Sequence, residues 1–244
     1  MPLAVVTIPL SSLALAFLPV LVVLVILFRW SSDGKTAVYA VLRMVAQLTL
    51  VGYFLRYLFE SDAPWLILSV LTVMLLASSW IGIRHLRQKS KQAYGRALVA
   101  VAIGSIPTLL LIVLGVMRAE SIDARLIVPL GGMVFPPSMH VVSLIAERLQ
   151  AERDRGVTFL EAREVCLRAA LTPVTNSLLA VGLVSLPGMM TGQVLAGVPP
   201  MEAVRYQVMV MCMIFGASGI CAAIYLHLCS AEGLTAEGPT ASRA

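Results

Sequence analysis

The sequence predicts an all-α fold, a polytopic membrane bundle of about seven transmembrane helices. Its 244 residues are 59% hydrophobic and only 13% charged, and the mean hydropathy is +0.91. The apolar residues form continuous runs of about 20 residues, the length that a helix needs to cross a bilayer. Polar and apolar residues do not alternate within these runs, which excludes the strands of a membrane barrel.

Seven apolar runs mark the expected spans, which are separated by charged residues, glycine and proline. They cover residues 10–28, 37–59, 64–83, 97–117, 126–145, 171–196 and 203–229. We expect the first run to be a span and not a cleavable signal, because the leader before it carries no positive charge. Residues 1–229 are therefore predicted to form one transmembrane domain, and residues 230–244 a disordered cytoplasmic tail.

Basic residues predict the orientation of these spans, because loops rich in Lys and Arg stay in the cytoplasm. Three alternate loops carry them: Arg29 and Lys35; Arg84, Arg87, Lys89, Lys91 and Arg96; Arg148, Arg153, Arg155, Arg163 and Arg168. The N-terminus is then outside and the C-terminus in the cytoplasm of a multi-pass protein of the inner (plasma) membrane. We interpret these charges as topology signals in contact with membrane lipid, and we expect no nucleic-acid partner.

The segment around Pro187 is the centre of the functional prediction. A proline removes a helical hydrogen bond, and Gly188 and Gly192 have the spacing of small residues that pack helices together. In lipid, the freed backbone groups must be satisfied by neighbouring helices or by a water-filled cavity. We therefore expect the sixth helix to be bent and to lie inside the bundle.

The fifth span carries a second set of helix-breaking residues. They are Pro129, Gly131, Gly132, Pro136 and Pro137. The residue before a proline is pushed out of helical geometry, so a continuous helix is not expected here. Paired broken helices in a transporter point to its substrate path. The candidate path residues beside the two breaks are Gly131, Gly132, Met133, Pro187, Gly188, Met189, Met190 and Gln193.

Other polar or soft side chains extend this path. Arg43 and Gln47, four residues apart on the second span, share a helix face; Arg43 could line the bundle interior or reach the headgroups. Met189 and Met190 are candidate metal ligands because thioethers suit soft metals, although methionine also fills gaps in apolar packing. A lone histidine such as His140 is more often structural than a ligand.

Two motifs suggest an enzyme, but each lacks a residue that the corresponding enzyme site requires. Gly34-Lys35-Thr36 ends like a phosphate-binding loop, but Arg29 stands where that loop needs glycine. The chain itself is therefore expected to bind no nucleotide and no cofactor. Gly216-Ala217-Ser218-Gly219 resembles an intramembrane protease motif, which needs a histidine within hydrogen-bond reach of the serine. His227 lies about 13 Å further along the same helix, so packing by small residues is the better interpretation.

The segment of residues 147–170 is the main feature outside the spans. Thr158 and Glu161 have the spacing of a capping box, which predicts a helix that begins near Thr158 and runs into the sixth span. Such a helix could hold a peripheral ATPase or could be an ordinary amphipathic connector. The sequence alone does not distinguish these two interpretations of the helix.

Several stretches resemble a known family. They are Arg43, Gln47-Leu48 and Val51-Gly52-Tyr53; Pro129-Leu130-Gly131-Gly132-Met133; Arg168-Ala169-Ala170-Leu171 with Pro173; and residues 182–197 and 202–210. Together they are similar to the FetB-type permeases of ATP-binding-cassette (ABC) transporters, an iron-export family that includes plant aluminium-tolerance permeases. The resemblance implies a permease subunit that works as a homodimer with a separate cytoplasmic ATPase, which binds the ATP, and that exports an iron-like metal ion.

The same resemblance implies which residues meet the ATPase. They are Gly156, Thr158, Glu161, Ala162 and Arg168. Phe159 stands where the family has a proline.

No acidic residue lies deep in any span, which disfavours a hard-cation site of carboxylates. Four alternatives remain: a nucleotide-sugar cargo, an ATP-independent secondary transporter or channel, an intramembrane protease, and a structural membrane scaffold.

Overall fold

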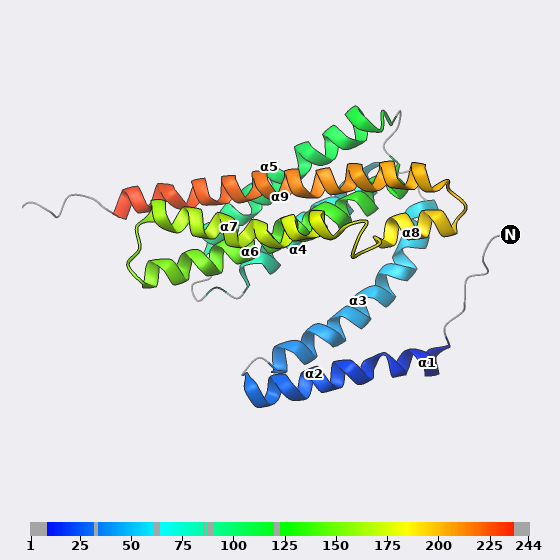
Figure 1. Ribbon diagram of the computed structural model, residues 1–244, viewed down its shortest axis with the longest axis horizontal. Helices are drawn as coiled ribbons and strands as arrows, with labels where there is room; N and C mark the ends of the chain where they lie inside the picture. Colours follow the sequence, from blue (N-terminus) through cyan, green and yellow to red (C-terminus); the bar gives the residue numbers. More distant parts are fainter. Residues whose placement is uncertain are drawn as a thin grey trace, which may run out of the picture. The chain divides into compact units, whose positions relative to one another are not determined.

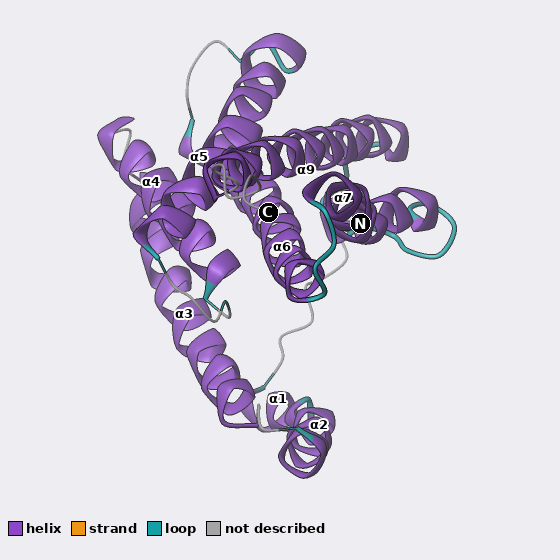
Figure 2. Ribbon diagram, turned by 90° about the vertical axis from the view of Figure 1, so that its left-hand side faces the viewer, coloured by secondary structure: helices purple, strands orange, loops and turns teal. Residues whose placement is uncertain are grey.

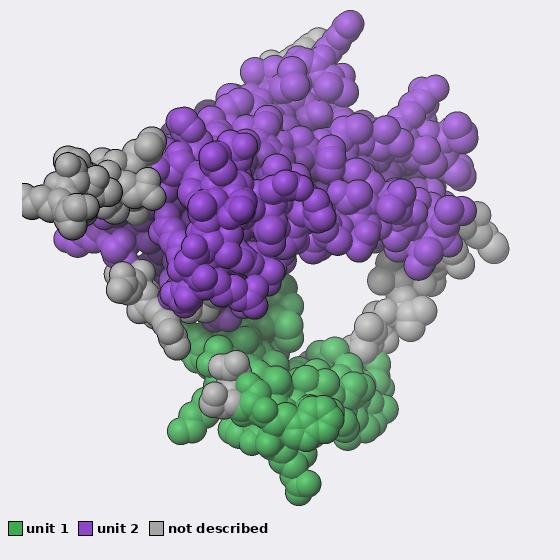
Figure 3. All heavy atoms as spheres, turned by 60° about the vertical axis from the view of Figure 1, so that its left-hand side comes forward, with its two compact units in different colours: residues 1–62 green, residues 63–244 purple. Residues whose placement is uncertain are grey.

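The protein is seen in a computed structural model that describes residues 9–31, 34–60, 64–84, 86, 90–119 and 123–236. These residues are helical apart from short connections and an isolated bridge between Val181 and Ser185, as Figure 2 shows. This confirms the predicted all-α fold. The chain divides into two compact units, Met1–Asp62 and Ala63–Ala244, which are coloured separately in Figure 3.

The first unit consists of three helices. They are α1 (Leu10–Leu15), α2 (Phe17–Trp30) and α3 (Gly34–Glu60). Helices α2 and α3 pack against each other, and a Cβ on Gly34 would lie only 2.7 Å from ring atoms of Phe28, so the close return of the chain requires glycine. No residue of α2 is buried in the chain. A helix that is apolar on all sides belongs in a bilayer.

The second unit holds the remaining helices. They are α4 (Pro64–Ile83), α5 (Lys91–Leu110), the π-helix η1 (Leu111–Val116), α6 (Ala124–Asp154), α7 (Phe159–Ala180), α8 (Gly188–Leu195) and α9 (Pro200–Ala236). Helix α9 packs against α5, α6, α7 and α8, and α6 also packs against α4 and α7. In Figure 1, α9 runs beside both α7 and α8. Helices α6 and α9 are therefore the centre of this unit.

Small residues bring α5 and α9 into close contact. A Cβ on Gly104 would lie 2.8 Å from the Cβ of Cys221 and 2.9 Å from the carbonyl oxygen of Ala217. Ser218 is fully buried, and its hydroxyl has no hydrogen-bond partner among the described residues. Ala217 and Ser218 therefore pack between helices, as expected of small residues in membrane bundles, and among the described residues no histidine is hydrogen-bonded to Ser218.

Six of the described helical segments are long and apolar enough to cross a bilayer. They are Ser11–Trp30, Gly34–Phe54, Pro64–Ile83, Lys91–Val116, Ala124–Asp154 and Pro200–Ser230. The chain is thus a multi-pass helical membrane protein. The predicted span at 171–196 differs from these six because the structure divides it between α7 and α8.

The fifth span is continuous, so the prediction of a break there is wrong. Pro129, Pro136 and Pro137 all lie inside α6, a helix of 31 residues. Each proline removes only one N–H donor from the helix. Leaving helical geometry in an apolar medium would expose several unpaired backbone groups, so the helix persists through its prolines.

The break predicted near Pro187 is confirmed, and it is a full interruption instead of a bend. Helix α7 ends at Ala180, and Gly182 has a φ of +83°, which only glycine adopts without strain. The N–H of Gly182 donates to the carbonyl oxygen of Ser185 over 2.9 Å. Pro187 then caps the start of α8 with extended geometry.

Helix α9 continues beyond the last predicted span. It reaches Ala236, so the first part of the segment 230–244, predicted to be a disordered tail, is helical. Residues 237–244 lie outside the described part of the chain. The predicted coupling loop at 147–170 is likewise mostly helical, because α6 extends to Asp154 and α7 begins at Phe159.

Candidate functional site

Two open hollows adjoin in the second unit where α6, α8 and α9 come together. The first hollow has a volume of about 490 Å³ and is also lined by α7 and the link between α7 and α8. The second hollow has a volume of about 600 Å³ and extends to the end of η1. Met133 on α6 and Met189 on α8 line both hollows. This methionine pair therefore lies between the two hollows.

Methionine thioethers are concentrated at these hollows. Besides Met133 and Met189, Met211 lines the first hollow, and Met117 and Met209 line the second. The chain has 12 methionines, so five of them converge here from four different elements. Methionine is a general filler of apolar gaps, but these five line open hollows and not the closed core.

Each hollow also holds an amide oxygen that has no hydrogen-bond partner in the described part of the chain. Gln207 lines the first hollow and is only 7% exposed. Gln193 lines the second hollow. The Oε1 atoms of both residues are buried and accept no hydrogen bond from the described residues. An unsatisfied buried acceptor costs about 1–3 kcal/mol, so both oxygens favour a bound group that can satisfy them.

The hollows differ in charge. Among the described residues that line the first hollow there is no carboxylate and no guanidinium; its polar groups are His140, Ser177, Ser185 and Gln207. The Ser177 hydroxyl already donates to a backbone carbonyl of α7 over 3.0 Å. The second hollow includes Arg125 and Glu202, and Glu202 is paired with Arg205 at 2.8 Å. The first hollow is therefore neutral and offers sulfur, amide and imidazole donors.

The structure brings together some of the predicted path residues and separates others. Met133, Pro187, Met189 and Gln193 line the hollows. Met190 lines neither of them, although it is adjacent to Met189. It is therefore a natural comparison for Met189.

The glycines of the predicted path pack in different ways. A Cβ on Gly131 would lie 2.8 Å from Leu71, so this glycine serves the contact of α6 with α4. Gly132 has only Met74 nearby, at 3.7 Å. A Cβ added to Gly188 or Gly192 would have no atom of the described residues within 4 Å. The predicted packing of Gly188 and Gly192 against another helix is therefore not found within the described part of this chain.

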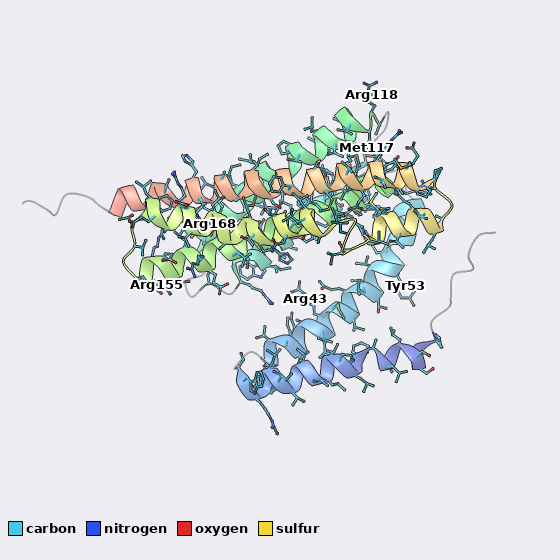
Figure 4. All side chains as sticks on the ribbon, viewed as in Figure 1. Arg43, Tyr53, Met117, Arg118, Arg155 and Arg168 are labelled. Carbon is cyan, nitrogen blue, oxygen red and sulfur yellow. The ribbon has the colours of Figure 1, made fainter. Side chains whose placement is uncertain are left out.

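Arg43 and Gln47 belong to the first unit. Both lie on α3, where Gln47 is exposed and Arg43 is half-buried; Figure 4 labels Arg43. Neither residue lines the two hollows. Their place on the substrate path stays a prediction.

The predicted ATPase-coupling residues surround the start of α7. Gly156, with a φ of +74°, forms the turn between α6 and α7. The Thr158 hydroxyl donates to the carboxylate of Glu161 over 2.9 Å, so the predicted pair forms between side chains instead of capping the backbone. Ala162 is fully buried, whereas Arg168 is exposed and paired with Glu164 at 2.7 Å. Ala162 is therefore inaccessible to a partner protein, whereas the other four residues are accessible.

The same turn lies beside a buried ion-pair cluster. Glu152 is only 5% exposed and pairs with Arg148 at 2.8 Å and with Arg155 at 3.6 Å. Burial raises the pKa of the nearby Cys166 thiol to about 11, and the negative charge of Glu152 adds to the effect. Cys166 thus stays protonated at neutral pH, which makes it a poor metal ligand.

The ends of α5, α6 and α9 meet at this cluster, and we name this region the basic end. Arg153 donates to the carbonyl oxygen of Cys229 over 3.3 Å, and Arg96 contacts the Cys229 sulfur at 4.0 Å. Met117 lies at the opposite end of the unit from Arg155, as Figure 4 shows. The second hollow is therefore remote from the basic end.

The sequence analysis did not single out four of the methionine and glutamine residues that line the hollows. They are Met117, Gln207, Met209 and Met211. The available signal was strongest for Gln207, because an amide inside a predicted span needs a polar partner in the membrane. The methionines carry no local signal that distinguishes them from packing residues.

The fold and these hollows define a class of protein: a multi-pass helical membrane protein with open, thioether-lined hollows between its helices. Residues 10–233 match the uncharacterised protein family UPF0014, and the chain belongs to this family.

Named relatives agree with this assignment. The UPF0014 membrane protein slr1647 of Synechocystis is 32% identical over 77% of this chain and 80% of its own length. The probable iron export permease protein FetB of Escherichia coli is 30% identical over 89% of each chain. Protein ALUMINUM SENSITIVE 3 of Arabidopsis thaliana is 29% identical over 86% of this chain and 82% of its own length. The predicted family is thereby confirmed. No solved structure matches the chain.

Proposed function

We propose that this protein is the membrane permease subunit of an ABC transporter that exports an iron-like metal ion, using a separate ATPase subunit. The observation that carries the proposal is the pair of adjoining hollows, which are lined by five thioethers and two unpartnered amide oxygens. A relative that is named a probable iron export permease supports the same cargo.

The donor groups favour a soft or borderline metal ion over the other cargoes. Thioether and imidazole ligands select such metals, whereas hard cations require several oxygen ligands, mainly carboxylates. A nucleotide sugar carries phosphates that are recognised by Arg or Lys. The described lining of the first hollow has neither carboxylate nor guanidinium.

Helix α7 supports a route from an ATPase to the cargo. Its first residues follow the exposed turn at the basic end, and its last residues, including Pro173 and Ser177, line the first hollow. A helix is a stiff rod, so a push on the turn at 156–162 would move the far end of α7 and the interruption that follows it. Transport then requires that the two access states differ in their affinity for the metal.

The outer face of α7 supports a homodimer. Thr172, Thr175 and Asn176 are exposed there and, with Glu164 and Arg168, line a shallow hollow of about 440 Å³. The first three of these residues belong to the span predicted at 171–196, and polar groups in a span are costly when they face acyl chains and often bond to a neighbouring helix. A second copy of the chain would cover this face.

The experiment is ATP-driven metal flux in proteoliposomes that contain the permease with its cognate ATPase. We expect Fe²⁺ flux that requires both subunits and ATP. Met189→Leu should reduce the flux several-fold because it removes a thioether shared by both hollows, while Met190→Leu should leave it unchanged. Metal flux without the ATPase would instead establish a secondary transporter or channel, and flux of a nucleotide sugar without metal flux would overturn the cargo.

A further inference from the structure

We propose that Gln207 is a direct ligand of the transported cation, and that its amide oxygen completes a neutral binding station with Met133 and Met189 in the first hollow. This inference deepens the proposed function, because it names a ligand that selects the metal. It is nevertheless tested on the permease alone, without an ATPase.

The burial of Gln207 is the first step of the argument. The residue is 7% exposed and lies on α9 between the buried residues Ala203 and Val210. Its buried Oε1 accepts no hydrogen bond from the described residues, and the residue is part of the lining of an open hollow. Leaving such an acceptor unpaired costs free energy, and a bound ligand in the hollow recovers that cost.

The chemistry of the hollow defines the ligand. An amide oxygen interacts favourably with a cation or a hydrogen-bond donor and unfavourably with an anion. The described lining contains no fixed positive charge to attract an anion and no carboxylate to hold a hard cation. The remaining donors are thioethers, the amide oxygen and the imidazole of His140. This mixture suits a soft or borderline transition-metal ion, and excludes Mg²⁺ and Ca²⁺.

A binding site made of uncharged ligands suits a transported metal ion better than one that is stored tightly. Ligands without charge hold a cation less tightly than carboxylates or thiolates do, and a transported ion must leave its site as well as enter it. The second hollow repeats the pattern, since Gln193 offers a second unpartnered oxygen beside Met117 and Met209. A cation could therefore pass the Met133–Met189 pair from the neutral first hollow to a second amide oxygen in the second hollow, whose lining also includes Arg125 and Glu202.

The test is equilibrium binding of Fe²⁺, under anaerobic conditions, and of Mg²⁺ to the purified full-length permease in detergent. We expect the wild type to bind Fe²⁺ and not Mg²⁺. Gln207→Leu, which keeps the volume and removes the oxygen, should weaken Fe²⁺ binding by about tenfold or more. The matched control is Gln150→Leu on α6, a half-buried glutamine outside both hollows, which should bind like the wild type.

A second variant keeps the proposal testable if Gln207→Leu does not fold. Gln207→Glu places a carboxylate at the same point, so Fe²⁺ should bind more tightly and its affinity should fall as the pH is lowered through the pKa of the new acid. A merely structural Gln207 would give no such gain and no such pH dependence. Unchanged Fe²⁺ binding in both variants, or strong Mg²⁺ binding by the wild type, overturns the inference.

The outcomes separate this inference from the proposed function. Fe²⁺ binding that depends on Gln207, combined with no ATP-driven flux, would support the station and reject the transporter. ATP-driven Fe²⁺ flux that is unchanged in Gln207→Leu would support the transporter and reject the station.

Discussion

Among single residues, Gly104 shows how closely the central helices approach. A Cβ added to Gly104 would lie 2.8 Å from the Cβ of Cys221 and 2.9 Å from the backbone oxygen of Ala217. Backbone atoms cannot move aside as the end of a flexible side chain can. The position therefore admits only glycine without a shift of α9.

We expect Gly104→Ala to destabilise the protein by about 1–3 kcal/mol, the usual cost of overpacking. Gly95→Ala on the same helix is the control, because no atom of the described residues lies within 4 Å of its added Cβ; it should be neutral or more stable by up to about 1 kcal/mol. Thermal unfolding in detergent, followed by tryptophan fluorescence, measures both. Equal stability of the two variants would show that α5 and α9 are further apart than described.

The candidate site could be predicted in part from single residues. Met133, Met189 and Gln193 stand beside glycine and proline, and this local pattern marks a weakened helix in a membrane. Gln207 has no such neighbour, and it reaches the first hollow only because α9 packs against α6 and α8. Contacts between residues so far apart in the chain have no local sequence signal.

Among the helices, α6 and the α7–α8 segment show why proline alone does not predict a break. Helix α6 contains three prolines and stays continuous, whereas the α7–α8 segment is interrupted at 181–187. The difference is a turn in which Val181 is extended and Gly182 has a positive φ, after which Pro187 occupies the N-cap position of α8. Rules for proline derived from helices in water overestimate its effect in lipid, where backbone groups without partners cost more.

The outer face of α7 leads to a prediction about assembly. If two copies meet there, Asn176→Cys, in a chain whose exposed Cys212 is replaced by alanine, should form an oxidation-dependent dimer band on a non-reducing gel. Leu110→Cys on α5 is also exposed but lies on a different, apolar helix face, and should give little cross-linked product. Equal cross-linking of both variants, or none with Asn176→Cys, would contradict a dimer through α7.

For the molecule as a whole, the distribution of charge predicts which end faces the cytoplasm. The basic end carries Arg96, Arg148, Arg153 and Arg155, which come from α5, α6 and the turn that follows α6. The alternation of basic loops along the sequence already predicts this clustering. The division into two compact units could not be predicted, because the polar residues at their boundary, Glu60, Ser61 and Asp62, resemble those of any loop between two spans.

We expect the basic end to face the cytoplasm, because Lys and Arg are retained on that side during insertion. In intact cells, a membrane-impermeant maleimide should label Arg118→Cys and should label Arg155→Cys only after the cells are permeabilised. Both positions are exposed. Labelling of Arg155→Cys in intact cells would reverse the orientation, and labelling of both positions from the same side would contradict the arrangement of α5 and α6.

Under the proposed function, the methionine lining of the hollows has a chemical consequence, because iron is a redox-active metal. Peroxide converts a thioether to a sulfoxide, which is polar and offers oxygen in place of sulfur. Oxidation of Met133 and Met189 would therefore replace soft sulfur ligands with hard oxygen ligands. The larger side chains would also narrow the space between the hollows. Damage of this kind is reversed by methionine sulfoxide reductases, so transport by the proposed mechanism would depend on cellular repair as well as on ATP.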